Sequence, residues 1–288
     1  MSETYEQQKA RNRQADLARL RGLRPIDDDF LRCLFRDNIP LAEFVLRIIT
    51  GKSDLVVTSL ETQKDFKRLG GSRSVCLDAY ATDASGKKYD LEIQRSSYGA
   101  GTHRARYHAS SMDIENLDAN QKFEDLPDTY TIFVTETDFF REGKPLYPIE
   151  RVNLATGKLF QDGTHILYVN GEYRDSSPIG KLMHDFSCWD PSDMNYTELK
   201  TITRYYKENP KGVEIMCQAF EETRAEGRAE GRAEGRAEGR AEGHAEGVEE
   251  TRISSIRSLM KTMKLTAEQA MDALSIPSEE QEKLHNLI

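Results

Sequence analysis

Apolar and polar residues alternate along two neighbouring stretches of the chain, residues 75–83 and 87–94, and this alternation predicts a β-hairpin. The connection Ala84-Ser85-Gly86 fits a three-residue hairpin loop that is closed by a glycine in the left-handed conformation. Such a loop pairs Asp83 with Lys87. Counting back along both arms from that pair places Asp78 directly opposite Glu92.

The polar face of this predicted hairpin is acidic. Side chains alternate between the two faces of a strand, so Asp90, Glu92 and Gln94 share one face of the second arm. On the first arm Asp78 is expected on the face opposite to Leu77 and Ala79. Two opposed carboxylates, with about 5 Å between Cβ atoms, repel each other and destabilise a sheet. The arrangement is either the solvated face of a half-exposed sheet or a site for a divalent metal ion.

The spacing of apolar residues predicts helices and further strands on both sides of the hairpin. Helices are expected as a pair between residues 27 and 51, divided near Pro40 and ended by Gly51, and over residues 103–117, 179–186 and 198–206. Strands are expected over residues 56–60, 130–134, 147–154 and 165–169. Strands interspersed with helices predict an α/β domain with a mixed central sheet flanked by helices.

The composition changes abruptly after Phe220. Arg-Ala-Glu-Gly occurs five times between residues 224 and 243, and His-Ala-Glu-Gly follows. In a helix each residue would lie over its own copy one turn away, which brings like charges together, and each glycine costs about 1 kcal/mol relative to alanine. The segment is therefore either a solvated spacer or an oligomerisation rod with close glycine contacts. Fully helical, these repeats would span about 36 Å.

These patterns divide the chain into four segments. We expect a polar N-terminal arm over residues 1–25, a compact domain over 26–210, the repeat spacer over 211–247, and a small helical C-terminal segment over 248–288. The last segment contains an amphipathic helix to residue 263. A second helix starts with capping-box character at Thr266, and a third follows Pro277. These helices could pair with each other or with a second copy of the chain.

The net charge of −9 is unusual for a protein whose main partner is nucleic acid, because neutralising phosphates requires Lys and Arg. The charge is uneven, however. Residues 113–150 carry ten acids against three bases, and residues 1–24 carry six bases against three acids, so a local basic surface is compatible with the composition. The four cysteines form no Cys-x-x-Cys pair, and no signal peptide or membrane helix is recognisable. We therefore expect a cytoplasmic protein with reduced thiols and no membrane partner.

Two facing carboxylates with an amide beside them suit metal-assisted hydrolysis of a phosphodiester. Asp78 and Glu92 can hold Mg²⁺ or Mn²⁺, which prefer oxygen ligands. A bound metal lowers the pKa of its water and neutralises charge on the phosphate. Gln94, on the same face, could position the attacking water.

At these residues the chain resembles the PD-(D/E)XK nuclease family, in the branch of transposase-associated or recombination-promoting nucleases. The signature is Asp78 followed by Glu92-Ile93-Gln94 on the next strand. Further stretches that resemble this branch are Asp29-Phe30 through Phe35, Arg104-Ala105-Arg106-Tyr107, Tyr130 to Val134, Ile166 to Gly171 and Ile179 to His184. The similarity covers roughly residues 25–247.

The resemblance implies a restriction-endonuclease-like core, with Asp78 and Glu92 as metal ligands and DNA as the substrate. Gln94 occupies the position of the family's usual lysine, and Leu77 replaces the proline of the signature. A glutamine cannot carry charge, so it would orient water without acting as a cation. An acid from an earlier element sometimes completes such sites. Asp29 and Glu61 are both candidates.

Other residues are weaker candidates for binding DNA or a metal ion. Arg104 and Arg106 follow the hairpin and could grip a phosphate, although a solvated helix face explains them equally well. His184 and Cys188 lie four apart on a predicted helix, where packing explains them better than zinc. The sequence thus favours a Mg²⁺-dependent DNA endonuclease in recombination or transposition. The alternative is a catalytically inactive nuclease fold that acts in binding or assembly through its helical tail, with self-association as a homo-oligomer.

Overall fold

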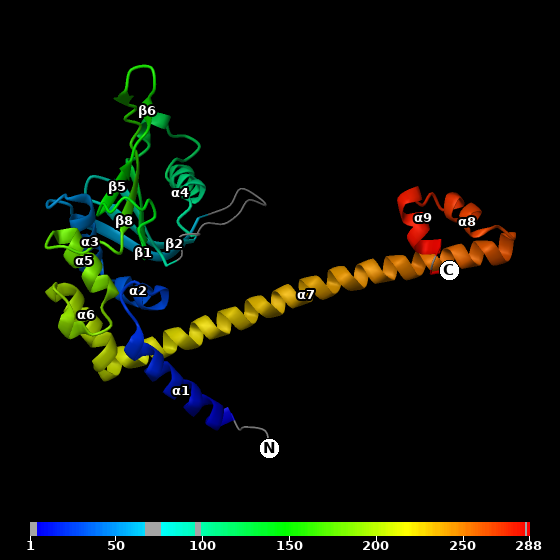
Figure 1. The fold of residues 1–288 in the computed structure, drawn as a ribbon, viewed down its shortest axis with the longest axis horizontal. Helices are drawn as coiled ribbons and strands as arrows, with labels where there is room; N and C mark the ends of the chain where they lie inside the picture. Colours follow the sequence, from blue (N-terminus) through cyan, green and yellow to red (C-terminus); the bar gives the residue numbers. More distant parts are fainter. Residues whose placement is uncertain (1–4, 67–75, 96–98, 286) are drawn as a thin grey trace. The chain divides into compact units, whose positions relative to one another are not determined.

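The computed structural model of the chain describes residues 5–66, 76–95, 99–285 and 287–288 (Figure 1). The chain divides into two compact units, residues 1–221 and residues 222–288. Each unit has its own hydrophobic core. Ser74 and Val75, at the start of the predicted hairpin, lie outside the described residues.

A six-stranded mixed sheet forms the centre of the first unit. Its strands are β1 (Val57–Asp65), β2 (Cys76–Asp83), β3 (Lys88–Gln94), β4 (Thr129–Thr135), β8 (Thr164–Asn170) and β5 (Leu146–Ile149), in that spatial order. The strands β1, β2 and β3 pair antiparallel with one another, and β3, β4 and β8 run parallel. The edge strand β5 is antiparallel to β8. This arrangement confirms the predicted mixed α/β fold.

Helices cover both faces of the sheet, and the chain order explains why. One face packs on the main core with α2 (Asp28–Phe35), α3 (Ile39–Thr50) and α5 (Pro178–Ser187). The other face carries α4 (Thr102–Glu115), the crossover helix between the parallel strands β3 and β4 (Figure 1). Because both faces are covered, β3 and β4 are buried along most of their length.

The pair of helices expected between residues 27 and 51 is confirmed. Asn38 caps α3 by accepting a hydrogen bond from the backbone N–H of Leu41 at 3.2 Å, and Pro40 lies in the first turn. Gly51 ends the helix with φ of 69°, a left-handed conformation that glycine adopts without steric cost. The strand expected over residues 56–60 is longer in the structure, since β1 continues to Asp65.

The remaining elements of the first unit surround this core. They are α1 (Tyr5–Gly22), η1 (Phe123–Asp125), the hairpin of β6 (Val152–Asn153) and β7 (Lys158–Leu159), η2 (Pro191–Asp193) and α6 (Thr197–Glu208). The long helix α7 (Pro210–Met263) starts in this unit. Its first turns bury Met216 and Phe220 completely in the main core.

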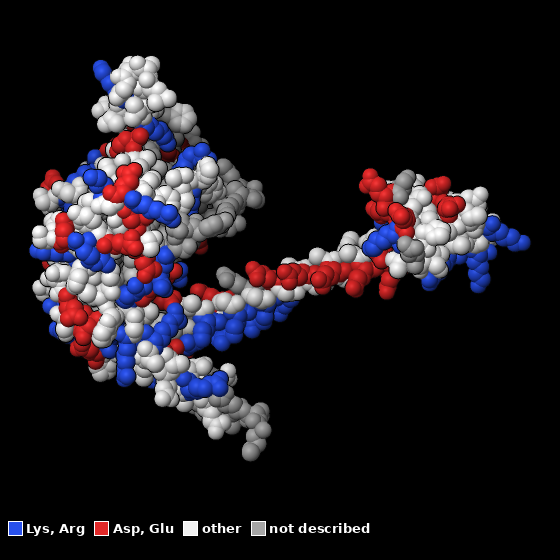
Figure 2. All heavy atoms as spheres, viewed as in Figure 1, with Lys and Arg blue, Asp and Glu red and all other residues white. Residues whose placement is uncertain are grey.

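The second unit contains the repeats and a small helical core. The repeats lie within α7, and from Arg228 to Gly247 the described side chains are exposed. Figure 2 shows arginines on one side of this helix and glutamates on the other, as expected for residues two apart, or about 200° around the axis. The end of α7 packs with α8 (Ala267–Ala273) and α9 (Ser278–His285), and the predicted capping box joins Thr266 and Gln269.

Among the helices that the structure describes, none combines the length and the apolar content needed to cross a bilayer.

Candidate metal centre

The hairpin has the register that its loop predicts. Asp83 donates its backbone N–H to the carbonyl of Lys87 at 3.0 Å, and Gly86 has φ of 85°. The Asp83 carboxylate also accepts hydrogen bonds from the backbone N–H groups of Ser85 and Lys87, which fixes the loop. Paired residues continue up the hairpin to Ala79 opposite Leu91. The next position along both strands brings Asp78 to Glu92.

At that position, hydrogen bonds from backbone N–H groups to side-chain carboxylates replace the backbone-to-backbone hydrogen bonds between the two strands. The backbone N–H of Asp78 donates to Glu92 Oε1 at 3.0 Å, and the backbone N–H of Ile93 donates to Asp78 Oδ2 at 3.1 Å. Each carboxylate is thus anchored to the backbone of the opposite strand. The Gln94 amide donates to Glu92 Oε2 at 3.4 Å. The structure therefore brings together Asp78, Glu92 and Gln94, the three residues that the sequence singled out.

The backbone on the other side of Asp78 is strained. Gln63 of β1 lies opposite Asp78, and it has φ of 54°, which is uncommon for a residue other than glycine within a strand. Leu77 packs in one cluster with Tyr80, whereas Ala79 contacts the main core. The predicted shared face of Leu77 and Ala79 is therefore wrong, because the strand alternation breaks at Asp78. Such strain persists where the surrounding structure holds it, often at functional sites.

A second layer of polar side chains lies behind this pair, and the sequence analysis did not assign it a role. His108 of α4 is buried, and its Nδ1 lies 3.0 Å from Asp90 Oδ2 and 3.9 Å from Glu92 Oε1. Arg104, one turn earlier on α4, donates through Nε to His108 Nε2 at 3.2 Å and through Nη2 to Glu92 Oε2 at 3.4 Å. His108 Nε2 is therefore the acceptor, and the Nδ1 proton points to Asp90.

Two sequence signals could have identified this layer. Asp90 lies two residues before Glu92 and so shares its face of β3. His108 lies four residues after Arg104 and so shares its face of α4. What the sequence could not supply is the packing of α4 across β3 and β4, which makes these two faces meet.

The low-dielectric environment of the centre opposes ionisation. Burial raises the pKa of Glu92 to about 9, and the charges of Asp90 and Asp78 add to the effect. Burial also raises the pKa of Asp78 and raises the pKa of Asp90 well above its ordinary value. The pKa of His108 is lowered by burial, so its ring is neutral at pH 7. Without a cation, the carboxyl group of Glu92 therefore retains its proton at neutral pH.

The two acids proposed to complete the site are engaged elsewhere. Asp29 forms an ion pair with Arg19, and Glu61 forms one with Lys64 at 2.9 Å. Asp28 of the same helix lies near enough to the centre for its charge to raise the pKa of Asp78, since α2 contacts β2. Asp28 itself has a raised pKa, mainly from burial.

The two candidate DNA-binding arginines differ in position. Arg104 faces the carboxylates, and 43% of its side chain is exposed. Arg106 is exposed and lies two residues further on, about 200° around the helix, so it points away from the centre. Arg104 is consequently the one that a phosphate at Asp78 and Glu92 would meet.

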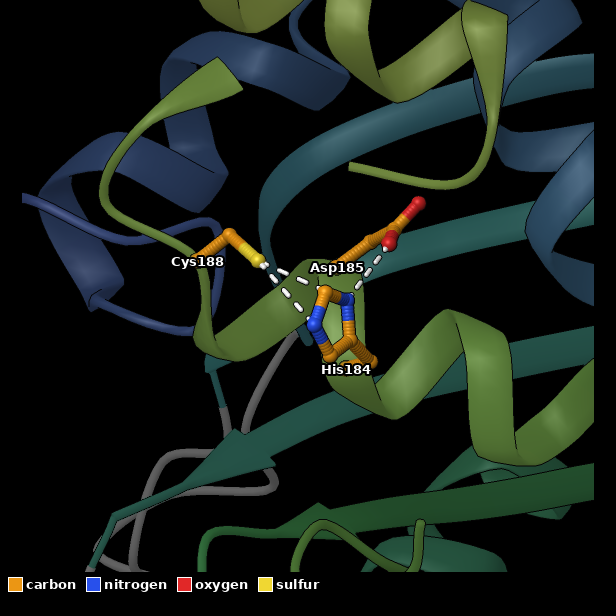
Figure 3. Close-up of side chains that lie close together, drawn as sticks. All are labelled: His184, Asp185 and Cys188. Atoms are coloured by element: carbon orange, nitrogen blue, oxygen red, sulfur yellow. Dashed lines mark hydrogen bonds and ion pairs between the residues drawn. The ribbon is translucent and has the colours of Figure 1, made fainter. Parts of the chain in front are cut away.

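A separate group of side chains, His184, Asp185 and Cys188, lies at the end of α5 (Figure 3). The buried Asp185 carboxylate accepts backbone hydrogen bonds from Asn195 and Tyr196, both at 2.7 Å, and holds the chain before α6. Burial raises the pKa of the Cys188 thiol to about 11, so it stays protonated at neutral pH. Because the Asp185 carboxylate is bound to the backbone, only His184 and Cys188 of this group could bind a metal ion. A structural zinc site has four ligands.

The residues of the main centre suit a divalent cation. The carboxylates of Asp78, Asp90 and Glu92 lie close to the Arg104 guanidinium, and Arg32 adds a second positive charge near Asp78. Within the part of the chain that the structure describes, buried Asp90 Oδ1 has no hydrogen-bond partner. Carboxylate oxygens are the donors that Mg²⁺ and Mn²⁺ prefer, so the donor set fits the metal that the sequence predicts.

A family model described as PD-(D/E)XK nuclease family transposase matches residues 37–184. The matched range contains the whole hairpin and α4, and it agrees with the resemblance derived from the sequence. Comparisons with curated proteins and with solved structures gave no match.

Proposed function

Since the chain belongs to the PD-(D/E)XK nuclease family transposases, we propose that it is a metal-dependent DNA endonuclease acting in recombination or transposition. Asp78 and Glu92 are the proposed metal ligands, Gln94 is the third catalytic residue, and DNA is the substrate. The observation that carries the proposal is the mutual anchoring of the two carboxylates across β2 and β3, at 3.0 Å and 3.1 Å.

These contacts explain how two acids can face each other in a folded sheet. Each carboxylate accepts a backbone hydrogen bond, which offsets part of the cost of its burial. A bound Mg²⁺ would supply an activated water and neutralise charge on the scissile phosphate. Gln94 lies beside Glu92 and can donate or accept a hydrogen bond, so it would orient the attacking water. Arg104 would hold a phosphate oxygen as a charged donor.

The test is nicking of supercoiled plasmid DNA by the full chain with Mg²⁺ or Mn²⁺, and with a chelator. We expect nicking that depends on the divalent ion. Asp78→Asn and Glu92→Gln keep the size of each side chain and should each reduce nicking at least a hundredfold. Glu124→Gln removes an exposed acid from η1 and serves as the matched control. Equal nicking by all four proteins would refute the assignment.

A second proposed function is assembly by a catalytically inactive nuclease fold. The net charge of −9, the glutamine at position 94 and the opposed charge stripes of the repeats favour it. It predicts that calorimetry detects no Mg²⁺ or Mn²⁺ binding and that truncation after Phe220 abolishes self-association. Metal binding at Asp78 and Glu92 together with plasmid nicking would exclude it.

A further inference from the structure

The buried layer behind the proposed catalytic pair has the composition of a ligand set in its own right. One ligand atom from each of Asp90, Glu92 and His108 lies within 4.8 Å of the other two. The three residues are at most 3% exposed. They come from β3 and from α4, which packs against the strands β4 and β8 beside β3, so the set is preformed.

Hydrogen bonds within the protein do not satisfy this set. His108 Nδ1 reaches Asp90 Oδ2 at 3.0 Å, but the other oxygen of the same carboxylate has no partner among the described residues. A buried carboxylate oxygen without a donor is costly, and native structures rarely leave one in place. That oxygen is satisfied either by a proton held on the neighbouring Glu92 carboxyl or by a cation that replaces the proton.

Charge balance indicates what that group is. Asp28, Asp78, Asp90 and Glu92 carry four negative charges when ionised, and Arg32 and Arg104 return two positive charges, that of Arg104 at 3.4 Å from Glu92. A divalent cation compensates the remaining two. A bound cation lets these carboxyl groups release the protons that burial otherwise retains, which a neutral ligand cannot do.

The geometry points to a second cation site formed by Asp90, Glu92 and His108, which binds a divalent transition metal ion such as Mn²⁺ or Co²⁺. An imidazole nitrogen beside two carboxylates favours these ions over Mg²⁺, which prefers oxygen ligands alone. The inference rests on the proposed function in one respect, because Glu92 would serve both this site and the catalytic pair. Asp90 and His108 would serve this site only.

The position of Arg104 gives this site a consequence for DNA binding. Arg104 Nε–H donates to His108 Nε2, which requires the ring proton on Nδ1. A metal ion held by Nδ1 requires the ring proton on Nε2, where it would oppose the Arg104 donor. Arg104 would then leave the ring. Since its side chain is 43% exposed, it can turn outward to a phosphate.

The experiment measures metal binding by the metal-free full chain, without DNA. Mn²⁺ is added, and pulsed electron paramagnetic resonance detects whether a nitrogen nucleus is coupled to the ion. We expect nitrogen coupling in the unmodified protein and in His103→Gln, an exposed histidine on the same helix. His108→Gln keeps a donor for Asp90 but has no imidazole, so it should lose the coupling and bind Mn²⁺ about tenfold to a hundredfold more weakly.

Asp90→Asn provides a second variant if His108→Gln does not fold, and it should weaken Mn²⁺ binding by a similar factor. Absence of nitrogen coupling in the unmodified protein, or unchanged coupling in His108→Gln, would overturn the inference. Plasmid nicking with Mg²⁺ is scored separately. Nicking without nitrogen coupling overturns the second site alone, and coupling without nicking overturns the proposed function alone.

Discussion

At the scale of single residues, backbone hydrogen bonds hold the two carboxyl groups of the centre in place, whereas burial opposes their ionisation. The backbone N–H groups of Asp78 and Ile93 hold the two carboxylates in fixed positions. Burial opposes their ionisation and raises the pKa of Glu92 to about 9. A cation would reverse this balance, so the protonation and stability of the protein should both respond to metal and to pH.

The first residue-scale prediction concerns the stability of the metal-free protein. Between about pH 5 and pH 9 the folded chain holds a proton on Glu92 that the unfolded chain has released. Stability therefore falls as pH rises through this interval, by up to about 1.4 kcal/mol per pH unit for each extra proton. Urea unfolding of chelator-treated protein at several pH values measures the slope. Glu92→Gln cannot ionise and should flatten it; an unchanged slope would assign the effect to another group.

The second residue-scale prediction concerns Gln94. Its amide lies 3.4 Å from Glu92 Oε2, close enough to share a water with the proposed metal. Gln94→Ala should lower the nicking rate on the order of tenfold to a hundredfold, because a misplaced nucleophile reacts slowly. Metal affinity from calorimetry should change less than about twofold, since an amide is not a proposed ligand. A large loss of metal affinity would instead make Gln94 part of the metal site.

At the scale of secondary structure elements, the sequence predicted best where local chemistry fixes the geometry. The loop Ala84-Ser85-Gly86 determines the register of the hairpin, and that register brings Asp78 to Glu92. The sequence pattern did not predict the packing between elements that are distant along the chain. Nothing local shows that α4 places His108 over Asp90, or that α2 brings Asp28 near Asp78. The left-handed conformation of Gln63 and the break in alternation at Asp78 were likewise not predictable from the pattern.

The repeats of α7 give a prediction at the element scale. A Cβ added at Gly231, Gly235 or Gly239 would meet no atom within 4 Å. Replacing all three with alanine should stabilise this stretch of helix by about 1 kcal/mol per site and raise the helical signal in circular dichroism. Gly212→Ala is the contrasting control, because its Cβ would lie 2.2 Å from the Tyr205 carbonyl oxygen and should destabilise the protein. If the triple substitution weakens self-association, the glycines act as close helix contacts.

At the scale of the whole molecule, the two units suggest where the chain can be divided. The sequence predicts a domain boundary at residue 210, and the first compact unit of the structure runs to Glu221. Met216 and Phe220 are fully buried in its core. We predict that residues 1–221 fold and nick plasmid DNA, whereas a chain ending at Asn209 loses about 2–5 kcal/mol for each of the two buried side chains. Thermal unfolding of both fragments measures this, and equal stability would place the boundary at residue 210.

Self-association of the full chain is the remaining prediction at this scale. The arginines and glutamates of the repeats form opposed stripes, and each stripe turns by about 40° per repeat because four residues exceed one helical turn. Two copies can therefore match arginine to glutamate over a limited crossing only, and such exposed pairs are weak and screened by salt. Sedimentation velocity should show a dimer at about 0.05 M salt that dissociates by about 0.5 M. Residues 1–221 lack the repeats and should stay monomeric at both concentrations. A dimer that persists in high salt would instead indicate an apolar interface, for which the helical core around Ile256 is the better candidate.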